Sequence, residues 1–157
     1  MCHYCGCRQI PLIKEFIAEH ETVTNAAGDA LRALDTGDVP RAQALLSTMT
    51  AVLLAHWKGE EDGLFAVMST DPEYAPYIEA LISEHRELAT FLARADLTDA
   101  EDAELFRRST ADLHHHIAKE EDGLFPASLT ALTGEDWNRS IQAWQSAHPE
   151  SELHPAG

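Results

Sequence analysis

Two copies of one decapeptide carry the residue types that bind metal ions. HWKGEEDGLF spans residues 56–65, and HIAKEEDGLF spans residues 116–125. Each copy places a histidine four residues before a glutamate, as His56 with Glu60 and His116 with Glu120. Because an α-helix has about 3.6 residues per turn, such a pair lies on one face, one turn apart. The imidazole and the carboxylate then point at one spot, which is the arrangement that a metal ion needs.

Two further histidines fit the same pattern. His20 and His85 lie on apolar faces of helical patterns, in the similar contexts EFIAEHETV and ALISEHREL, so the repeat extends to whole pairs of helices. A lone histidine on an apolar face is most often a core residue with satisfied hydrogen bonds. Four such histidines, one per helix and two of them with a glutamate at i+4, instead favour a shared metal site.

Five segments with helical periodicity would position these side chains. Four are long: about residues 10–34, from after Asp38 to before Asp71, about residues 72–95 and about residues 99–131. The fifth is short, at residues 135–147. Pro40 falls in the first turn of the second helix, Thr98 is the candidate cap of the fourth, and Pro126 should bend the end of the fourth.

Long helices joined by short turns imply antiparallel neighbours. The sequence therefore predicts an all-α fold, an antiparallel up-down-up-down four-helix bundle with a short C-terminal fifth helix. We expect a Cys-rich N-terminal segment at residues 1–8, the bundle at 9–132, and a short helix and tail at 133–157. Gly63 and Gly123 fall mid-helix, where glycine costs about 1 kcal/mol relative to alanine. They indicate either a close helix approach or a local break in the helix.

Composition bounds the class of protein. A chain of 157 residues with 45% apolar content is long enough for one well-filled core, and a net charge of −16 argues against nucleic acid or an anionic membrane as a partner. No apolar run approaches the length of a spanning helix, and the chain opens with polar MCHYCGC rather than a basic and then apolar leader. We expect a soluble, cytoplasmic, bacterial protein.

The order His20, His56-x-x-x-Glu60, His85, His116-x-x-x-Glu120 resembles the hemerythrin-like, or HHE cation-binding, domain over about residues 9–132. This resemblance implies that the six residues hold a buried non-haem di-iron centre, with two bridging carboxylates and an oxo or hydroxo bridge. Ferritin-like di-iron bundles are the nearest alternative. They present Glu-x-x-His with the glutamate first, whereas this chain has the reverse order and an i+4 spacing.

One position departs from the family pattern. Oxygen-carrying hemerythrins have a second histidine one turn before the one on the third helix, and this chain has Leu81 there. With four histidines, each iron would receive two imidazoles, two bridging carboxylate oxygens and the solvent bridge, and would keep one open position. Such a centre is expected to favour bridging ligands, peroxide turnover or NO over reversible O2 carriage.

A few other side chains are candidates to replace the histidine that is missing at Leu81. Tyr77 lies two turns before His85 on a similar face, so it is a candidate cavity residue. His114 and His115 are rotated away from His116 and should face neighbouring helices or solvent. The remaining acidic residues of the repeat are expected on a solvated surface: Glu61, Asp62, Glu121 and Asp122.

The N-terminal segment carries a second pattern, Cys-x-x-Cys-x-Cys, formed by Cys2, Cys5 and Cys7. This spacing suits a soft metal such as zinc, a redox-sensing thiol group, or no defined role. A closed zinc site would need a fourth ligand, which His3, His148 or His154 could supply. A permanent disulfide is not expected in a reducing cytoplasm.

Two functions from different classes fit the predicted centre. One is a di-iron redox protein that binds or reacts with O2, H2O2 or NO, including a peroxide- or NO-consuming enzyme. The other is a binding module that senses or stores iron without turnover and reports through the fifth helix or the cysteine segment. Both use the same ligands, so the sequence does not separate them.

Overall fold

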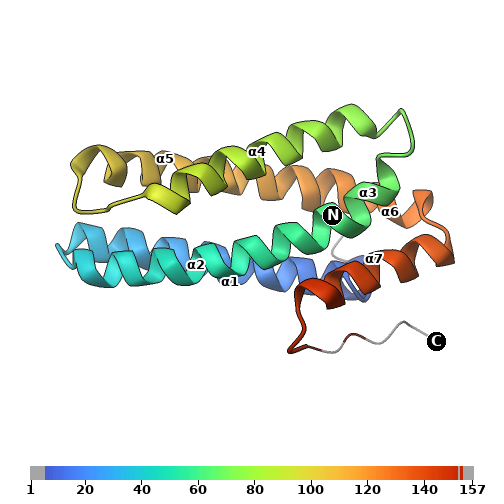
Figure 1. Cartoon of the computed structure of the whole chain (residues 1–157), viewed down its shortest axis with the longest axis horizontal. Helices are drawn as coiled ribbons and strands as arrows, with labels where there is room; N and C mark the ends of the chain where they lie inside the picture. The colour runs from blue at the N-terminus through green and yellow to red at the C-terminus, as the bar shows by residue number, and fades with distance from the viewer. Residues whose placement is uncertain (1–5, 152, 154–157) are drawn as a thin grey trace.

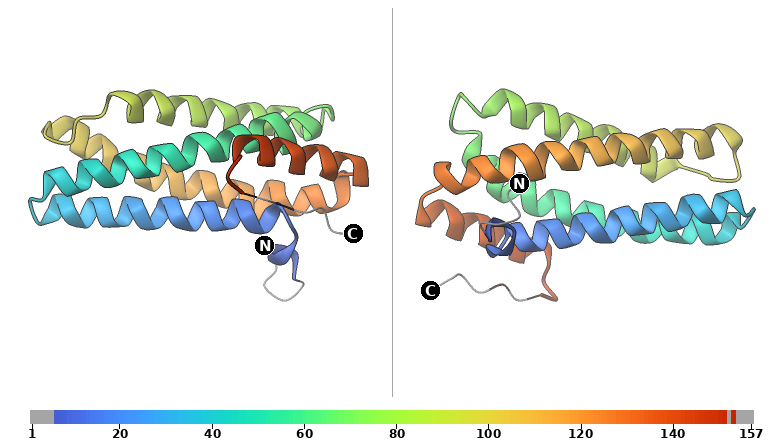
Figure 2. Two further views of the ribbon diagram at one scale, coloured as in Figure 1. Left: turned by 60° about the horizontal axis from the view of Figure 1, so that its bottom comes forward. Right: turned by 180° about the vertical axis from the view of Figure 1, so that it is seen from behind.

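The computed structural model describes residues 6–151 and 153, and every regular element in this part of the chain is helical. Four long helices form the body: α1 (Ile13–Asp35), α2 (Val39–Gly59), α4 (Ala75–Arg94) and α5 (Ala100–Lys119). They pack lengthwise, with α1 beside α2 and α4 beside α5 (Figures 1 and 2). The predicted all-α fold is confirmed.

Shorter elements complete the chain: η1 (Cys7–Gln9), α3 (Ala66–Met68), α6 (Phe125–Ala131) and α7 (Gly134–Ala147). The predicted short fifth helix corresponds to α7, which lies along the end of α2 in Figure 1. The caps explain where the helices begin. Asp38 accepts a hydrogen bond from the Arg41 backbone at 3.2 Å, and Asp99 accepts one from the Glu101 backbone at 2.7 Å. The N-cap of α5 is therefore Asp99, and the prediction of Thr98 was wrong by one residue.

Both copies of the repeated decapeptide leave α geometry. They form the π-helical segments η2 (Glu60–Phe65) and η3 (Glu120–Leu124), each beginning at a glutamate of the candidate site. A π-helix closes its hydrogen bonds over five residues instead of four, which widens the turn, and such segments are frequent at functional sites. The glycines of the repeat indicated a close helix approach or a local break here, and the structure shows that the departure from α geometry is a π-helical segment in each copy.

The repeated glycines lie in these π segments and permit close approaches. A Cβ on Gly63 would lie 2.9 Å from the Ala143 Cβ and 3.0 Å from the Ser140 carbonyl oxygen, so α7 packs directly on η2. A Cβ on Gly123 would lie 2.9 Å from the Tyr77 hydroxyl. Both alternatives drawn from the sequence therefore hold, since each glycine meets a close neighbour and lies where the α-helix is interrupted.

Gly63→Ala is expected to lower the free energy of unfolding by about 1–3 kcal/mol, because the added methyl group meets backbone atoms of α7. Gly28→Ala is the matched control, since its Cβ would meet only the Arg32 guanidinium, at 3.5 Å. That helical change should stabilise the protein by roughly 0.5–1 kcal/mol. Urea denaturation measures both values, and equal effects of the two substitutions would contradict the packing of α7 on η2.

The apolar core consists of two clusters, and each long helical stretch passes from one to the other. One cluster holds Val23, Leu53, Leu92 and Leu113, and the other holds Phe16, Leu64, Leu81 and Leu124. Each candidate histidine lies between a residue of the first cluster and a residue of the second. The polar site is therefore enclosed at both ends by hydrocarbon, which excludes water and strengthens electrostatic interactions inside it.

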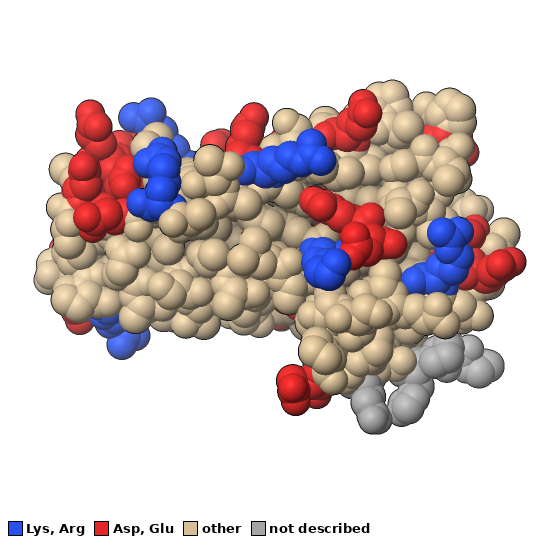
Figure 3. Space-filling model, viewed as in Figure 1, with Lys and Arg blue, Asp and Glu red and all other residues tan. Residues whose placement is uncertain are grey.

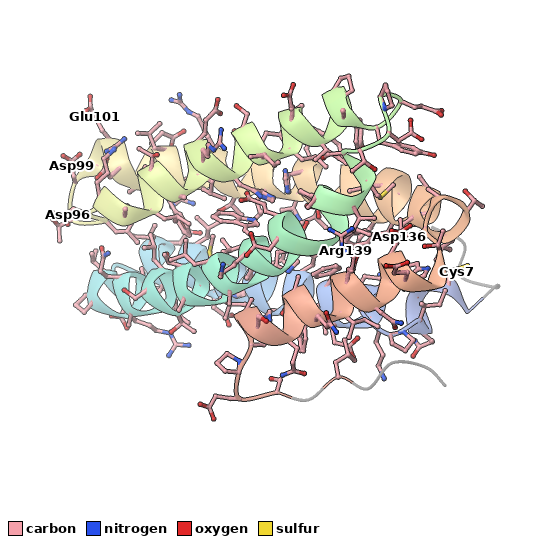
Figure 4. The ribbon with its side chains drawn as sticks, turned by 45° about the vertical axis from the view of Figure 1, so that its right-hand side comes forward. Cys7, Asp96, Asp99, Glu101, Asp136 and Arg139 are labelled. Atoms are coloured by element: carbon pink, nitrogen blue, oxygen red, sulfur yellow. The ribbon has the colours of Figure 1, made fainter. Side chains whose placement is uncertain are left out.

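The surface agrees with the acidic composition. A cluster of acidic side chains lies at the left-hand end of the face shown in Figure 3, where the chain connects α4 to α5, with basic side chains beside it, and further acidic and basic side chains are scattered over the rest of this face. Asp96, Asp99 and Glu101 lie at this end, whereas Cys7 lies at the opposite end, where α6 meets α7 (Figure 4). Among the described residues, no helix is long and apolar enough to cross a membrane.

Candidate metal centre

The six predicted ligands come together inside the bundle. They form two groups of potential ligand atoms that lie within 4.8 Å of one another: His20, His56, Glu60 and Glu120 in one group, and His85, His116 and Glu120 in the other. All six side chains are buried, and both glutamates are fully enclosed. Glu120 belongs to both groups, so its carboxylate lies within reach of both pairs of histidines.

The histidines are paired through their Nε2 atoms. The distance between the Nε2 atoms is 3.0 Å for His20 and His56, and 2.9 Å for His85 and His116. Glu60 contacts the Nε2 atom of His56. Glu120 places one oxygen 2.5 Å from the Nε2 atom of His116 and the other 4.0 Å from that of His20.

The opposite ring nitrogen of every histidine contacts a carboxylate. We call these four glutamates the outer carboxylates. The Nδ1 atoms of the histidines lie 2.5–2.8 Å from their oxygens, in the pairs His20 with Glu121, His56 with Glu19, His85 with Glu61, and His116 with Glu84. A carboxylate can only accept from an imidazole, so the proton of each neutral ring is on Nδ1.

This tautomer leaves the Nε2 atoms available to bind a metal ion. With the proton on Nδ1, each Nε2 atom presents a lone pair, and all four lone pairs converge with the carboxylate oxygens. Among the described residues, none of the four oxygens of Glu60 and Glu120 has a hydrogen-bond partner, although all are buried. Buried acceptors that face one another are satisfied by protons or by a bound cation. Imidazole and carboxylate ligands with carboxylates behind the imidazoles suit a transition metal.

The pKa shifts show what the protein does with protons at this site. Burial lowers the pKa of His20 and of His85, which favours their neutral, metal-binding form. Burial and the neighbouring Glu120 charge raise the pKa of Glu60 well above its ordinary value. Burial would lower the pKa of His116, but Glu120 and Glu84 outweigh it and raise that pKa. These shifts favour the protonated forms of Glu60 and His116 in the metal-free centre.

Metal binding should release these protons. Because a bound cation displaces a proton from Glu60, the apparent affinity for metal should rise roughly tenfold per pH unit for each proton displaced, and should fall by the same factor on acidification. Isothermal titration calorimetry in buffers of different ionisation enthalpy counts the protons released. A count of zero at pH 6 would contradict the assignment of the raised pKa to Glu60.

The family model described as the hemerythrin HHE cation-binding domain matches residues 12–128. The chain belongs to the hemerythrin family. No curated protein and no solved structure matches it. The matched hemerythrin domain contains all six candidate ligands and all four outer carboxylates, whereas η1 and α7 lie outside it.

The outer carboxylates correct one expectation from the sequence. Glu61 and Glu121 were expected on a solvated surface, but they contact His85 and His20. Glu19 and Glu84, which contact His56 and His116, were not predicted as site residues from the sequence. A signal for them exists, since Glu19 and Glu84 each directly precede a lone histidine of the hemerythrin domain, and Glu61 and Glu121 each directly follow a candidate bridging glutamate.

Tyr77 does not lie in the hemerythrin metal cavity, so its prediction as a cavity residue was wrong. Its ring is 39% exposed, and its hydroxyl donates a hydrogen bond of 2.7 Å to the carbonyl of Lys119, where α5 passes into η3. Burial of the hydroxyl raises the pKa of Tyr77, which further disfavours a phenolate. Tyr77 therefore supports the π segment that carries Glu120. His114 and His115 are exposed, as expected.

A cavity of about 260 Å³ reaches the second histidine pair from the surface between α4 and α5. Trp57, Leu88 and Leu113 give it apolar walls, and Glu84, Glu87, Asp112 and His115 are among its polar lining residues. Trp57 also stacks on the His85 ring at a centroid distance of 4.9 Å. On the first pair, the ring of Phe125 stacks on His20 at 5.9 Å. A small molecule thus has a route to His85 and His116.

The cysteine segment is described only from Gly6 onward, so Cys2 and Cys5 lie outside the described residues. Cys7 is disulfide-bonded, contrary to the expectation that a permanent disulfide would not form. Among the described residues, the two groups of potential metal ligands contain no cysteine. The zinc and redox-sensing interpretations of the segment stay predictions.

Replacing Cys2, Cys5 and Cys7 together with serine is expected to leave the metal content of the hemerythrin centre and its optical spectrum unchanged, because the ligand groups formed by the described residues consist of histidine and glutamate. The substitution should remove any zinc bound at the N-terminus and any thiol-dependent dimer. Metal analysis, spectroscopy and non-reducing electrophoresis check these results. Loss of the spectrum would mean that sulfur belongs to the ligand set.

Proposed function

We propose that His20, His56, Glu60, His85, His116 and Glu120 hold two iron ions with an oxo or hydroxo bridge, and that the protein binds or reacts with O2, H2O2 or NO. The up-down-up-down order of the four long helices is part of this proposal. The observation that carries it is the convergence of four Nε2 lone pairs and two buried carboxylates, each imidazole being oriented by an outer carboxylate.

The chemistry of the donors supports iron. Mixed imidazole and carboxylate ligands in a helical bundle suit iron or manganese, and cysteine, which soft ions prefer, is absent from the ligand groups of the described chain. Bound iron would supply one-electron chemistry and an exchangeable coordination position. The protein would orient the ligands, exclude water through the apolar clusters and admit a small molecule through the cavity between α4 and α5.

The position one turn before His85 supports reaction over simple carriage. Leu81 is buried there, 1% exposed, and offers no ligand atom. Two imidazoles then serve each of the proposed ions, which leaves at least one open position on each. We therefore favour a centre that takes bridging ligands or consumes peroxide or NO.

The iron-loaded protein tests this function directly. Anaerobic samples are exposed separately to O2, H2O2 and NO while optical spectra and ligand consumption are recorded. Catalytic loss of peroxide or NO, at a rate that scales with iron content, is the expected result. A spectrum that responds to none of the three ligands would overturn the proposal.

A second candidate is an iron-sensing or iron-storing module without turnover. One observation favours it, since both flanks of the hemerythrin domain contact outer carboxylates. Arg8 pairs with Glu121 at 2.9 Å, and Trp144 donates to Glu19 at 3.1 Å. Iron-dependent folding or partner exchange without turnover would favour this candidate.

A further inference from the structure

Residues outside the hemerythrin domain hold the outer carboxylates of one histidine pair. Glu19 contacts His56 through one oxygen, and its other oxygen accepts from the indole N–H of Trp144 and lies 2.5 Å from the Nε2 atom of His148. Glu121 contacts His20 through one oxygen and pairs with Arg8 through the other. The family match ends at residue 128 and begins at residue 12, so all three supporting side chains lie beyond it.

We propose that Arg8, Trp144 and His148 form a clamp that positions His20 and His56, and so makes the metal position at this pair different from the one at His85 and His116. The proposal rests on the proposed function for the presence of metal at both pairs. The three clamp residues are positioning residues, because they act on the centre only through Glu19 and Glu121.

Glycines on α2 and η2 allow α7 to pack closely enough for this contact. A Cβ on Gly59 would lie 3.3 Å from the Trp144 ring and 3.4 Å from the Trp144 Cα, so glycine allows α7 to approach α2 one turn beyond His56. Gly63 allows the same approach one turn later. The chain thus brings the Trp144 backbone close enough for the indole N–H to reach Glu19.

His148 completes the contact at the end of α7. Its ring stacks on Trp144 at a centroid distance of 4.1 Å, and its Nδ1 atom lies 2.7 Å from the Trp144 carbonyl oxygen. Because that carbonyl is an acceptor, the Nδ1 proton donates to it. The ring is thereby held with its Nε2 atom toward a Glu19 oxygen.

The other pair of histidines has a different environment. Glu84, behind His116, contacts Lys119 of α5 within the hemerythrin domain and is 37% exposed, and Glu61, behind His85, is 34% exposed. In the clamped pair, Glu19 is 13% and Glu121 15% exposed. The α4–α5 cavity also reaches the second pair. The outer carboxylates of His20 and His56 are therefore the more buried ones, whereas His85 and His116 lie beside the cavity that opens to solvent.

Glu19, Glu121 and Glu84 are each held at both oxygens, but of these three Glu84 takes its second contact from Lys119 within the hemerythrin domain. The more buried Glu19 and Glu121 are instead fixed by side chains from outside the domain. The outer partner of a metal-bound histidine fixes its tautomer and orientation. Loss of the clamp should therefore loosen the bond between Glu19 and the Nδ1 proton of His56, while leaving the bond between Glu84 and His116 unchanged.

Nuclear magnetic resonance of the full chain loaded with zinc, a diamagnetic probe, tests this inference. The Nδ1 protons of His56 and His116 are assigned, and their exchange with solvent is measured in the wild type and in Trp144→Phe, His148→Gln and the double variant. We expect exchange at His56 to become roughly tenfold faster in the double variant, with exchange at His116 unchanged. Arg8→Gln should act in the same way on His20.

Two controls separate positioning from general loosening. Trp137→Phe removes another indole from α7, one that packs in the apolar cluster, and should leave His56 unchanged. Lys119→Met should speed exchange at His116 but not at His56. Unchanged exchange at His56 in the double variant, or equal acceleration at both histidines, would overturn the clamp.

The single variant His148→Gln guards against a folding defect in the double variant, because His148 lies at the end of α7. Failure of the proposed function has a separate signature. A wild-type chain that takes up neither iron nor zinc would refute the metal centre, and the same exchange comparison on that metal-free protein would still decide whether α7 holds Glu19 against His56.

Discussion

Glu120→Ala should strip the protein of its metal. Glu120 is the carboxylate that belongs to both ligand groups, and its removal leaves Nε2 lone pairs facing one another with one fewer anion between them. Substitution of outer partners alone costs metal sites about 10–100-fold in affinity, so loss of a bridging ligand should cost at least about 100-fold. The iron content after dialysis against a chelator measures the effect, and the metal-free bundle should also unfold at lower denaturant concentration.

Glu60→Ala should have a related but less symmetric effect, because Glu60 groups only with the clamped pair. Glu104→Ala is a suitable control, since Glu104 lies on the same helix as His116 but is exposed and pairs with Arg108. Two irons retained by both the Glu60→Ala and the Glu120→Ala proteins would refute the ligand assignment.

Leu81→His should shift the proposed centre from peroxide consumption toward O2 binding. Leu81 is buried one turn before His85 on α4, so a histidine there would direct its ring at the open position of the second proposed ion. With that position filled, peroxide consumption should fall sharply and the lifetime of an O2 adduct should rise. Steady-state peroxide loss and optical spectra of the oxygenated protein measure the two changes.

Leu81→Asn is the matched control, because asparagine has the same number of side-chain heavy atoms as leucine, branched in the same way, and brings a polar group without an imidazole. It should destabilise the core but create no carrier-like spectrum. If spectra show the new histidine bound and turnover stays unchanged, another ligand must already fill the open position. Tyr77 could not be that ligand, since its hydroxyl is engaged by the Lys119 carbonyl.

Helical periodicity was enough to predict the long helices and to bring six ligands to one place, because residues on one face of a helix stay on that face. It was not enough for Glu61 and Glu121. In α geometry, each residue turns the chain by about 100°, which aims both side chains away from the site. In the structure both side chains reach the Nδ1 atoms of histidines on other helices, which depends on how the helices pack and not on the periodicity along one helix.

The π geometry of these two segments could not be predicted from the sequence. A π turn uses the same residue types as an α turn, and its stability here comes from tertiary contacts. Tyr77 donates to the carbonyl at the start of η3, and α7 packs on η2 at Gly63. The glycines hinted at a departure from regular helix, but neither their partners nor the wider turn could be inferred before the helices were placed in space.

The pairing of the outer carboxylates has a consequence for the origin of the fold. His20, in the first half of the chain, takes its carboxylate from Glu121 in the second half, and His85, in the second half, takes its carboxylate from Glu61 in the first. This reciprocal exchange is the contact pattern of an isologous interface between identical subunits. Two copies of a single helical hairpin could therefore build the whole centre as a symmetric homodimer. The present chain has the contact pattern of such a dimer joined by the residues between Met68 and Ala75. The segments on either side of the hemerythrin domain break that symmetry, because they contact Glu19 and Glu121, which lie behind one pair of histidines.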